Sequence, residues 1–208
     1  MADDLIILGV GVHAVEMADL VDRINAVRPR WRLAGFIRRR TDRTVETLAG
    51  RPVLGTVEAL AGWSGCHVAF EHDFHDDTGL AVERWASLVD PSVFVAASAV
   101  VGPGCVIYPH GFLGAAAVLG PRVFVLAGST INHDCVLDDH VTVCSGVTLA
   151  GGVHVEANTY LGQSCTIRQN VTIGAGSLIG MGSVVLHDVA PASVMAGNPA
   201  RLLRRKET

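Results

Sequence analysis

From Val95 to Ala190 the sequence divides into sixteen consecutive blocks of six residues, with no insertion between them. The first residue of every block is Val, Ile or Leu, and the fifth is always Ala, Cys, Gly, Ser, Thr or Val. A period of six fits neither the 3.6-residue period of an α-helix nor the alternation of a simple strand, but it is typical of parallel β-helices. Each block then forms one short strand and one turn, with the branched first residue inside and the small fifth residue beside it. Glycine and proline within the blocks argue against one long helix.

The composition suits such a solenoid. Hydrophobic residues make up 50% of the 208 residues, yet aromatic residues reach only 5% while 23 residues are glycine. The core must therefore be built from small and branched aliphatic side chains packed against a closely turning backbone. A net charge of -4 gives no basic surface for nucleic acid or for anionic lipid, so we expect small-molecule partners, no nucleic acid and no membrane.

The N-terminus carries two acidic residues and an apolar run of about five residues, which is neither a signal peptide nor a membrane span. We therefore predict a cytoplasmic protein. The five cysteines are odd in number, contain no Cys-x-x-Cys pair, and mostly occupy repeat positions that should be buried. They are expected to be reduced core residues.

Residues 1–90 lack the repeat and alternate strand-like and helix-like segments. A strand over 5–9, a helix from His13 to about Val27 and a strand over 32–37 predict a βαβ start. An extended segment near 52–55, a short helix near 56–62, a strand over 66–70 and an amphipathic helix around 79–89 follow. The sequence thus predicts a small α/β, Rossmann-like domain over 1–90 and a parallel β-helix domain with a C-terminal tail over 91–208.

A glycine loop lies between the first predicted strand and the first helix. Gly9 and Gly11 allow backbone N–H groups to approach a phosphate at a helix N-terminus, and His13 stands at the start of that helix. The sequence therefore favours phosphate binding at Gly9, Gly11 and His13. The alternative is a tight turn between strand and helix with no ligand.

Segments along nearly the whole chain resemble the sialic-acid and bacillosamine sugar acetyltransferases, which are hexapeptide-repeat acyltransferases: LIILGVGVHAVEMADLV, LAGFI, RPVLG, LVDPS, INHDC, LAGGV and AGNPARLL. The resemblance implies a left-handed β-helix with three blocks per coil, and a homotrimer with active sites between neighbouring subunits. It also implies that the front domain holds a nucleotide-linked sugar whose phosphates lie near Gly9, Gly11 and His13.

The chain departs from that family at two places. Arg38, Arg39 and Arg40 stand where the family usually has an acidic pair, so Arg38 is a candidate for binding a phosphate or carboxylate of the substrate, and a solvated basic loop is the alternative. The segment from Glu71 to Asp77 replaces a glycine-containing loop. Its composition indicates a polar loop rather than a metal site.

His133 and Asp134 are the candidate catalytic residues. His133 falls at the third place of its block, at a turn where side chains leave the core, and the family match at His-Asp-Cys implies the role of general base. Asp134 would orient the imidazole. By counting blocks, the family's second histidine corresponds to Thr142, and we do not transfer its role to the nearby His140. The other histidines of the repeat, His110, His154 and His187, are expected to be structural.

The predicted chemistry is direct attack on acetyl-CoA in a ternary complex. Gly151 and Gly152 are expected to supply backbone N–H groups to the tetrahedral oxyanion, and the resemblance places Gly151 at the thioester end of CoA. Cys135 is expected to point inward and to be inert. The tail residues Asn198, Pro199 and Arg201 resemble the segment beside CoA, with Arg204 and Arg205 as further phosphate ligands.

The sequence therefore predicts an acetyl-CoA-dependent acetyltransferase that acts on an amino or hydroxyl group of a nucleotide-activated sugar without a metal. One alternative is a γ-carbonic-anhydrase-like zinc enzyme, but that class pairs two histidines five positions apart, whereas His133 and His140 are seven apart. A sugar acceptor without a nucleotide is a second alternative, and a non-catalytic binding protein is a third. N-acetylation and O-acetylation require the same base and stay open.

Overall fold

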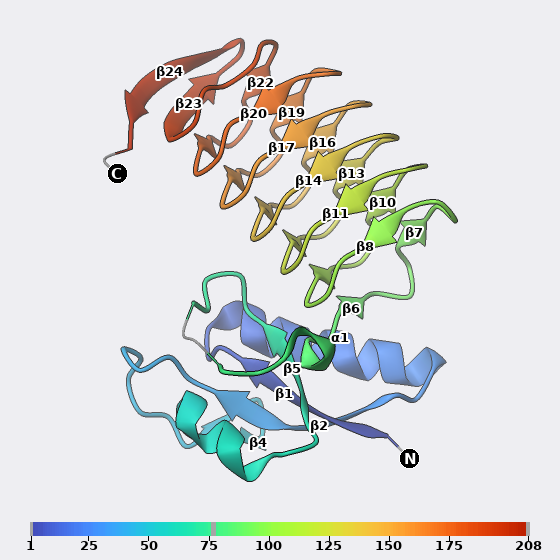
Figure 1. Ribbon diagram of the computed structural model, residues 1–208, viewed down its shortest axis with the longest axis vertical. Coiled ribbons are helices and arrows are strands. Elements are labelled where there is room, and N and C mark those ends of the chain that lie inside the picture. Colours follow the sequence, from blue (N-terminus) through green and yellow to red (C-terminus); the bar gives the residue numbers. More distant parts are fainter. Residues whose placement is uncertain (1, 76–77, 207–208) are drawn as a thin grey trace. The chain divides into compact units, whose positions relative to one another are not determined.

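The chain divides into two compact units, Met1–Pro91 and Ser92–Thr208 (Figure 1). The computed structural model describes residues 2–75 and 78–206, so Asp76 and Asp77 of the predicted polar loop lie outside the described residues. We refer to the two parts as the front unit and the β-helix unit.

The front unit is built on a three-stranded parallel sheet in the order β2 (Trp31–Ile37), β1 (Asp3–Leu8), β5 (His67–Phe70). Helix α1 (Val12–Val27) connects the first two strands, which confirms the predicted βαβ start. Its buried residues recur at the spacing of one helical stripe, so the helix covers the sheet through a single apolar face: Ala14, Met17, Ala18, Leu20 and Val21.

The rest of the front unit consists of short elements: β3 (Thr47–Leu48), β4 (Arg51–Pro52), the 3₁₀ helices η1 (Val57–Gly62) and η2 (Val82–Arg84), and β6 (Leu88–Val89). Large apolar side chains from the sheet and its loops form the core, among them Ile6, Leu8, Ile37, Val68, Phe70 and Phe74. With one α-helix in its described part, the unit is a small α/β fold, less than the Rossmann-like domain that the sequence predicts.

The amphipathic helix predicted around residues 79–89 is wrong. Only the single turn Val82–Arg84 is helical, and the chain then runs extended beside β5. The backbone N–H of Ala86 donates to the carbonyl of Val68 at 2.7 Å, and the Trp85 ring packs edge-on against Phe70 with ring centroids 5.2 Å apart. Pairing with a strand and partial burial of a large aromatic ring against the core therefore outweigh the local helical pattern.

The β-helix unit consists of two-residue strands that form three faces. The first face contains β7 (Phe94–Val95), β10 (Phe112–Leu113), β13 (Thr130–Ile131), β16 (Thr148–Leu149), β19 (Thr166–Ile167) and β22 (Val184–Val185). The second contains β8 (Val100–Val101), β11 (Val118–Leu119), β14 (Val136–Leu137), β17 (His154–Val155) and β20 (Thr172–Ile173). The third contains β9 (Val106–Ile107), β12 (Phe124–Val125), β15 (Thr142–Val143), β18 (Tyr160–Leu161) and β21 (Leu178–Ile179).

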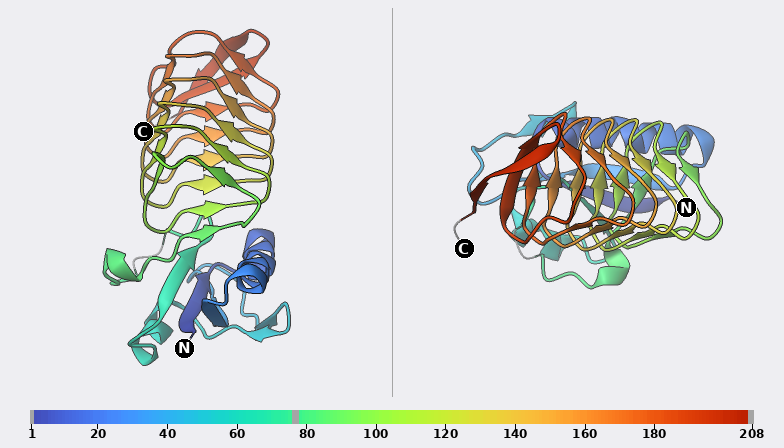
Figure 2. Two further views of the ribbon diagram at one scale, coloured as in Figure 1. Left: turned by 90° about the vertical axis from the view of Figure 1, so that its right-hand side faces the viewer. Right: turned by 90° about the horizontal axis from the view of Figure 1, so that it is seen from above.

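Each strand pairs in parallel with the strand three places further along the chain. Phe112 is paired with Thr130 and Thr130 with Thr148, so each pair is offset by three blocks. The same offset recurs on all three faces, and Figure 2 shows the resulting stack of coils. The predicted parallel solenoid with three blocks per coil is confirmed.

The core of the β-helix follows the block positions. First-position residues from Ile107 to Val185 are at most 2% exposed, and fifth-position residues from Cys105 onward are buried as well. The first coil is the exception, because Val95 is 39% exposed. Where the fifth residue is polar its hydroxyl is satisfied, as in Ser129, whose Oγ donates to the carbonyl of Cys144 at 2.9 Å.

The fourth residue of each block has a positive φ in every block from Gly104 to Gly182. The third and fourth residues form the centre of the turn, and a positive φ at its second central position is the mark of a type II turn. Eight of these positions are not glycine, and Asp134 with φ 59° is one of them. Asp and Asn accept this conformation more readily than most residues.

After the last coil, β23 (Ser193–Gly197) pairs in parallel with β21 and turns back into β24 (Ala200–Arg205). The Asn198–Pro199 peptide bond at the tip of this hairpin is cis. In the described part of the chain, no helix has both the length and the apolar character needed to cross a membrane.

Candidate functional site

His133 and Asp134 form the centre of the turn that joins β13 on the first face to β14 on the second. Both side chains point outward and are about two-thirds exposed, at 67% and 66%. The Nδ1 atom of His133 lies 2.7 Å from a carboxylate oxygen of Asp134. With the proton on Nδ1, this hydrogen bond fixes the ring and leaves Nε2 with a lone pair to accept a proton.

The imidazole of His133 lies directly over Gly151, which holds the same place one coil further on. A Cβ atom at residue 151 would lie 2.5 Å from Nε2 and would overlap the ring. Gly151 has no positive φ, so the glycine is needed for space rather than for backbone conformation. The close approach of the ring therefore depends on residue 151 having no side chain.

Backbone hydrogen bonds between the turn of His133 and the turn of Gly151 show which of the two predicted oxyanion donors, Gly151 or Gly152, has a free N–H. The N–H of Gly152 donates to the carbonyl of His133 at 2.9 Å, so this N–H is already used within the fold. The N–H of Gly151 has no acceptor among the described residues. Of the two predicted oxyanion donors, the one that is available is therefore Gly151.

Cys135 follows the pair and is fully buried, as predicted. Its thiol donates to the carbonyl of Ala150 at 3.1 Å, and burial raises the pKa of the Cys135 thiol above its ordinary value. A thiol in this environment is not a nucleophile near neutral pH.

The residues considered for a second histidine lie elsewhere on the β-helix. Thr142 is on the third face and is 8% exposed, and His140 stands at the turn between the second and third faces. His133 stands at the turn between the first and second faces, so one chain does not bring His140 to His133. Another histidine, His154, pairs with Asp138 on the second face at 3.1 Å.

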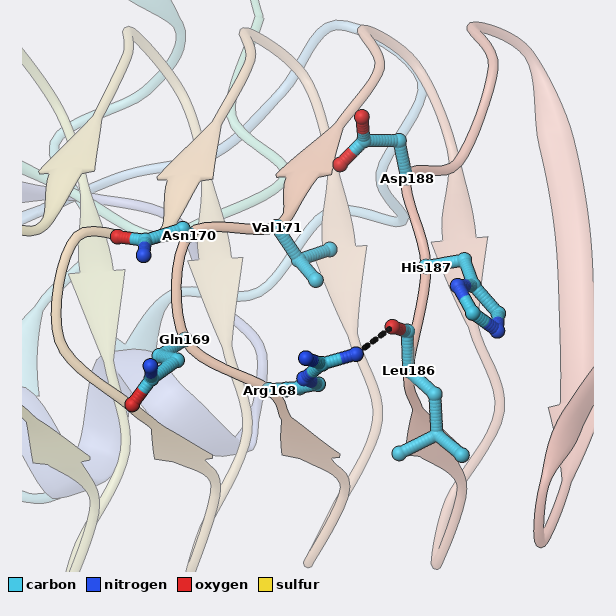
Figure 3. A pocket seen from close by; sticks show the side chains of 7 residues that line it. All are labelled: Arg168, Gln169, Asn170, Val171, Leu186, His187 and Asp188. Atoms are coloured by element: carbon cyan, nitrogen blue, oxygen red, sulfur yellow. Dashed lines mark hydrogen bonds between the residues drawn. The ribbon is translucent and has the colours of Figure 1, made fainter.

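The turn of His133 is one of a column of turns that recur once in every coil. We call the turns at 133–134, 151–152, 169–170 and 187–188 the 133–187 edge. A pocket of about 510 Å³ lies on this edge two coils beyond His133, lined by Arg168, Gln169, Asn170, Val171, Leu186, His187 and Asp188. Figure 3 shows Gln169 and Asn170 on one turn, His187 and Asp188 on the next, and Arg168 directed toward the carbonyl of Leu186.

Sequence reasoning did not single out this pocket. The signal was present, because Gln169 and Asn170 hold the places of Gly151 and Gly152 one coil further along the repeat. The Oδ1 atom of Asn170 also fills the space that a side chain at Gly152 would take. Counting whole coils from the candidate base leads directly to these residues.

The tail residues lie on the terminal hairpin. Asn198 and Pro199 form its tip, and Arg201 at the start of β24 is exposed, with its guanidinium donating to the neighbouring carbonyl of Ala200 at 2.9 Å. Arg205 instead donates to the carbonyl of Pro191 and to the Oγ of Ser193. Arg201 and Arg204 therefore remain available to an anion, whereas Arg205 already has structural partners.

Charge pairing differs between the two units. Five of the ten arginines of the front unit pair with carboxylates: Arg23 with Asp90, Arg32 with Asp4, Arg39 with Asp42 and Asp73, Arg40 with Glu58, and Arg51 with Asp22. Arg168, Arg201 and Arg204 of the β-helix unit have no carboxylate partner among the residues that the structure describes. Arginines without counter-charges are suited to phosphate recognition.

The glycine loop and Arg38 meet at the carboxyl edge of the parallel sheet in the front unit. Gly9 follows β1, Arg38 follows β2 and Glu71 follows β5, and ligands of parallel α/β sheets bind at such an edge. Of the three consecutive arginines, Arg38 is the one without a carboxylate partner in the described part of the chain, since it donates to the backbone carbonyls of Arg39 and Asp42.

The carboxylate of Glu71 lies where the sequence predicts a phosphate. It accepts a hydrogen bond from the N–H of Gly11 at 3.2 Å, and its side chain covers both Gly9 and Gly11. His13 pairs with Glu16 at 3.0 Å, and its ring lies edge-on to that of His72. The sequence marked Glu71 only as part of a polar loop, because nothing local shows a contact between segments so far apart in the chain.

The γ-carbonic-anhydrase alternative requires a cluster of metal-binding side chains. Over residues 2–75 and 78–206, no group of three or more His, Cys, Asp or Glu side chains is arranged to hold a metal ion.

The sequence matches the family described as "Bacterial transferase hexapeptide (six repeats)" over residues 152–187. No curated protein matches it. Among solved structures, the acetyltransferase domain of PglB from Neisseria gonorrhoeae in complex with acetyl coenzyme A is 25% identical, with a TM-score of 0.82 over 98% of this chain and 100% of that one.

Two further solved structures share the fold. A variant of perosamine N-acetyltransferase from Caulobacter crescentus with a histidine replaced by asparagine, in complex with CoA and GDP-perosamine, is 22% identical, with a TM-score of 0.81 over 97% of both chains. WeeI from Acinetobacter baumannii is 23% identical, with a TM-score of 0.79 over 97% of this chain and 100% of that one. The resemblance to hexapeptide-repeat acetyltransferases is confirmed for the repeat and for the fold.

Proposed function

We propose that this chain is an acetyl-CoA-dependent acetyltransferase that acts on an amino or hydroxyl group of a sugar. The observation that carries the proposal is the outward His133, held by Asp134 and seated on Gly151. It belongs to a fold that covers all of an acetyltransferase domain in complex with acetyl coenzyme A. Both the repeat match and this likeness favour an acyltransferase over a non-catalytic binding protein.

In the proposed reaction, His133 acts as a general base. Its Nδ1–H donates to Asp134, and Nε2 takes the proton from the amine or hydroxyl as that group attacks the thioester carbonyl. A C–N or C–O bond forms, the tetrahedral intermediate then loses the C–S bond, and the proton passes to the departing thiolate. No covalent enzyme intermediate is needed.

The proposed oxyanion donor is the backbone N–H of Gly151. It has no acceptor among the described residues and lies beside the His133 ring, so base and donor face the same small volume. A backbone donor fixed by the coil costs no reorganisation when the charge develops.

We place the rest of CoA along the 133–187 edge and at the tail. This edge carries the pocket lined by Arg168 and Asn170, and the tail carries Asn198, Pro199 and the exposed Arg201. Arginines without carboxylate partners are the natural ligands of the CoA phosphates. Gly152 contributes to this CoA site only through its lack of a side chain, which leaves the space that Asn170 fills.

The sequence predicts a nucleotide-activated sugar as acceptor, bound by Gly9, Gly11, His13 and Arg38 in the front unit, and the perosamine N-acetyltransferase that shares the fold holds GDP-perosamine. A specific observation favours the second candidate, a sugar without a nucleotide. Glu71 occupies the space over Gly9 and Gly11 that a phosphate would need.

A homotrimer of left-handed β-helices is part of the proposal. The second face carries a column of exposed valines, Val100, Val118 and Val136, which are 54%, 38% and 37% exposed. An apolar strip on a regular face is suited to contact with a second copy of the chain. A cytoplasmic location likewise remains a prediction.

The test is a screen of amino-sugars and hydroxy-sugars, each as nucleotide-linked and as free sugar, with acetyl-CoA and detection of the released thiol. We expect thiol release that depends on the sugar, with the acetylated product identified by mass spectrometry. Failure of every sugar to accelerate thiol release would refute the proposed function. Metal analysis of the purified protein tests the zinc alternative, since one zinc per active site would overturn the assignment.

A further inference from the structure

The glycine loop of the front unit already contains an anion. Glu71 is 4% exposed, and its carboxylate accepts the N–H of Gly11, the residue that caps helix α1. A Cβ atom at Gly9 would lie 2.6 Å from the Cβ of Glu71, and one at Gly11 would lie 3.1 Å from its carboxyl carbon. The whole side chain of Glu71 therefore fills the hollow above the two glycines.

This carboxylate occupies the place where helix α1 would bind an external anion. The helix has no side-chain cap and no acidic residue in its first turn, so its N-terminal N–H groups lack a local partner. Glu71 reaches the first of these groups, the N–H of Gly11, from the end of β5 and supplies the negative charge that a helix N-terminus favours. The chain thus satisfies with its own carboxylate what a phosphate would otherwise satisfy.

The position of Glu71 is fixed by its backbone. Its N–H donates to the carbonyl of Leu8 at 2.8 Å, and its carbonyl accepts the N–H of Phe74 at 3.0 Å. Phe74 is fully buried in the core of the unit. The segment is anchored on both sides, and only rotation of the side chain would clear the loop.

The Glu71 carboxylate itself and Asp73 oppose a second anion, although Arg38 at the same sheet edge has no carboxylate partner in the described part of the chain. Asp73 lies nearby, and Arg39 is held by Asp42 and Asp73. A phosphate placed on the loop would overlap the Glu71 side chain and meet a like charge at short range in a buried environment, where repulsion is poorly screened.

We propose that Glu71 is a specificity-determining residue that excludes phosphate from the glycine loop of the front unit. The consequence for the substrate rests on the proposed function: the acceptor is a sugar that brings no diphosphate to Gly9 and Gly11. The exclusion itself does not depend on acetyl transfer and is measured separately.

The experiment is calorimetric titration of UDP, GDP and inorganic pyrophosphate into the full chain. We expect the wild type to bind all three more weakly than about 1 mM. Glu71→Gly removes both the charge and the side chain. The association constant of this variant for pyrophosphate should be at least about tenfold higher than that of the wild type. Glu71→Gln removes the charge but keeps the volume, so its gain should be smaller.

Glu58→Gln is the matched control. Glu58 is a carboxylate of the same unit that pairs with Arg40 at 2.8 Å on an exposed surface. This variant should bind the three probes as the wild type does. Glu71→Gln keeps the size of the side chain and the oxygen that accepts the N–H of Gly11, so this variant should fold even if Glu71→Gly does not. Tryptophan fluorescence checks that each variant is folded.

Two outcomes would overturn the proposal. The first is tight binding of a nucleoside diphosphate by the wild type that the Glu71 variants leave unchanged. The second is equally weak binding by the wild type and by both folded variants, because Glu71 would then not be what excludes the phosphate. Absence of acetyl transfer to any sugar would refute the proposed function and leave the binding result standing.

Discussion

The two units of this chain relate sequence to structure in different ways. In the β-helix, the place of a residue within its block determines its environment, so residues one coil apart, such as His133 and Gly151, are stacked on one another. In the front unit, the environment of Glu71 depends on a contact with Gly11, which is distant in the sequence. In a repeat, contacts between residues can be predicted from their positions in the sequence. In a non-repetitive fold, contacts between distant residues are known only from the structure.

The difference extends to charge. The front unit pairs five of its ten arginines with carboxylates and fills its glycine loop with Glu71, while the β-helix unit presents Arg168, Arg201 and Arg204 without such partners in the described residues. The glycine loop that the sequence marks as the phosphate binder is therefore already filled by a carboxylate, although Arg38 at the same sheet edge has no carboxylate partner among the described residues. The unit proposed to hold CoA presents available cationic groups on its edge and its tail.

The largest effect on kcat is expected at His133, the residue that its position in the repeat identifies as the general base. His133→Ala should lower kcat for acetyl transfer by roughly 10²–10⁴, the range expected on removal of a general base. Steady-state kinetics with saturating acetyl-CoA measures it. His140→Asn, which keeps a residue suited to the positive φ of 59°, is the control and should leave kcat within about twofold. Undiminished transfer by folded His133→Ala protein would show that counting blocks does not locate the base.

The next effect tests whether block position sets the stability of the β-helix. Leu149 is fully buried at a first position, so Leu149→Ala should lower the free energy of unfolding by about 2–5 kcal/mol. Val95 holds the same place in the first block but is 39% exposed, and Val95→Ala should cost less than about 1 kcal/mol. Urea unfolding followed by far-UV circular dichroism compares them. Equal losses at the two positions would contradict the burial pattern.

These contrasts explain how much of the molecule could be predicted from its sequence. The period of six predicts the solenoid, the buried face and the outward place of His133, because each follows from the place of a residue within its block. It did not predict the exposed Val95, since the first coil has no coil before it within the repeat. Nor did it predict that Gly152 would donate its N–H to the carbonyl of His133.

In the front unit, local patterns predicted the βαβ start but failed where long-range contacts decide. The helical pattern around residues 79–89 gave way to pairing of Trp85 and Ala86 with β5. The loop chemistry of Gly9 and Gly11 was interpreted as phosphate binding, and the carboxylate of Glu71 lies there instead. No local signal in the sequence shows which distant side chain will fill a hollow.

A smaller effect tests the contact between coils. Gly151→Ala adds a Cβ atom that overlaps the His133 ring, so the ring must move and kcat should fall by about tenfold or more. Gly111→Ala is the matched control. The atom nearest to its new Cβ would be a methyl carbon of Ile107 at 3.5 Å, which is an ordinary contact. Neither glycine has a positive φ, so neither change strains the backbone. Comparable kcat values for the two variants would mean that the ring does not need its place over Gly151.

The smallest effect concerns the charge buried in the front unit. Burial raises the pKa of Glu71 above its ordinary value in the folded state, so folding favours the protonated acid. Its contribution to stability is then complete below the ordinary glutamate pKa and is lost as the pH rises through the raised folded pKa. Glu71→Gln lacks this titration, so the stability of the wild type relative to the variant should decline across that window. His13, Asp73 and Arg39 face the same carboxylate and are present in both proteins.

Tryptophan fluorescence is suited to this measurement, because the three tryptophans, Trp31, Trp63 and Trp85, all belong to the front unit. Urea unfolding at several pH values then reports on that unit alone. If the relative stability of the wild type instead rises with pH, the ionised carboxylate is stabilised by the N–H of Gly11 and the nearby cations. That outcome would contradict the expected loss of stability with rising pH and would show that the glycine loop stabilises the ionised form of Glu71.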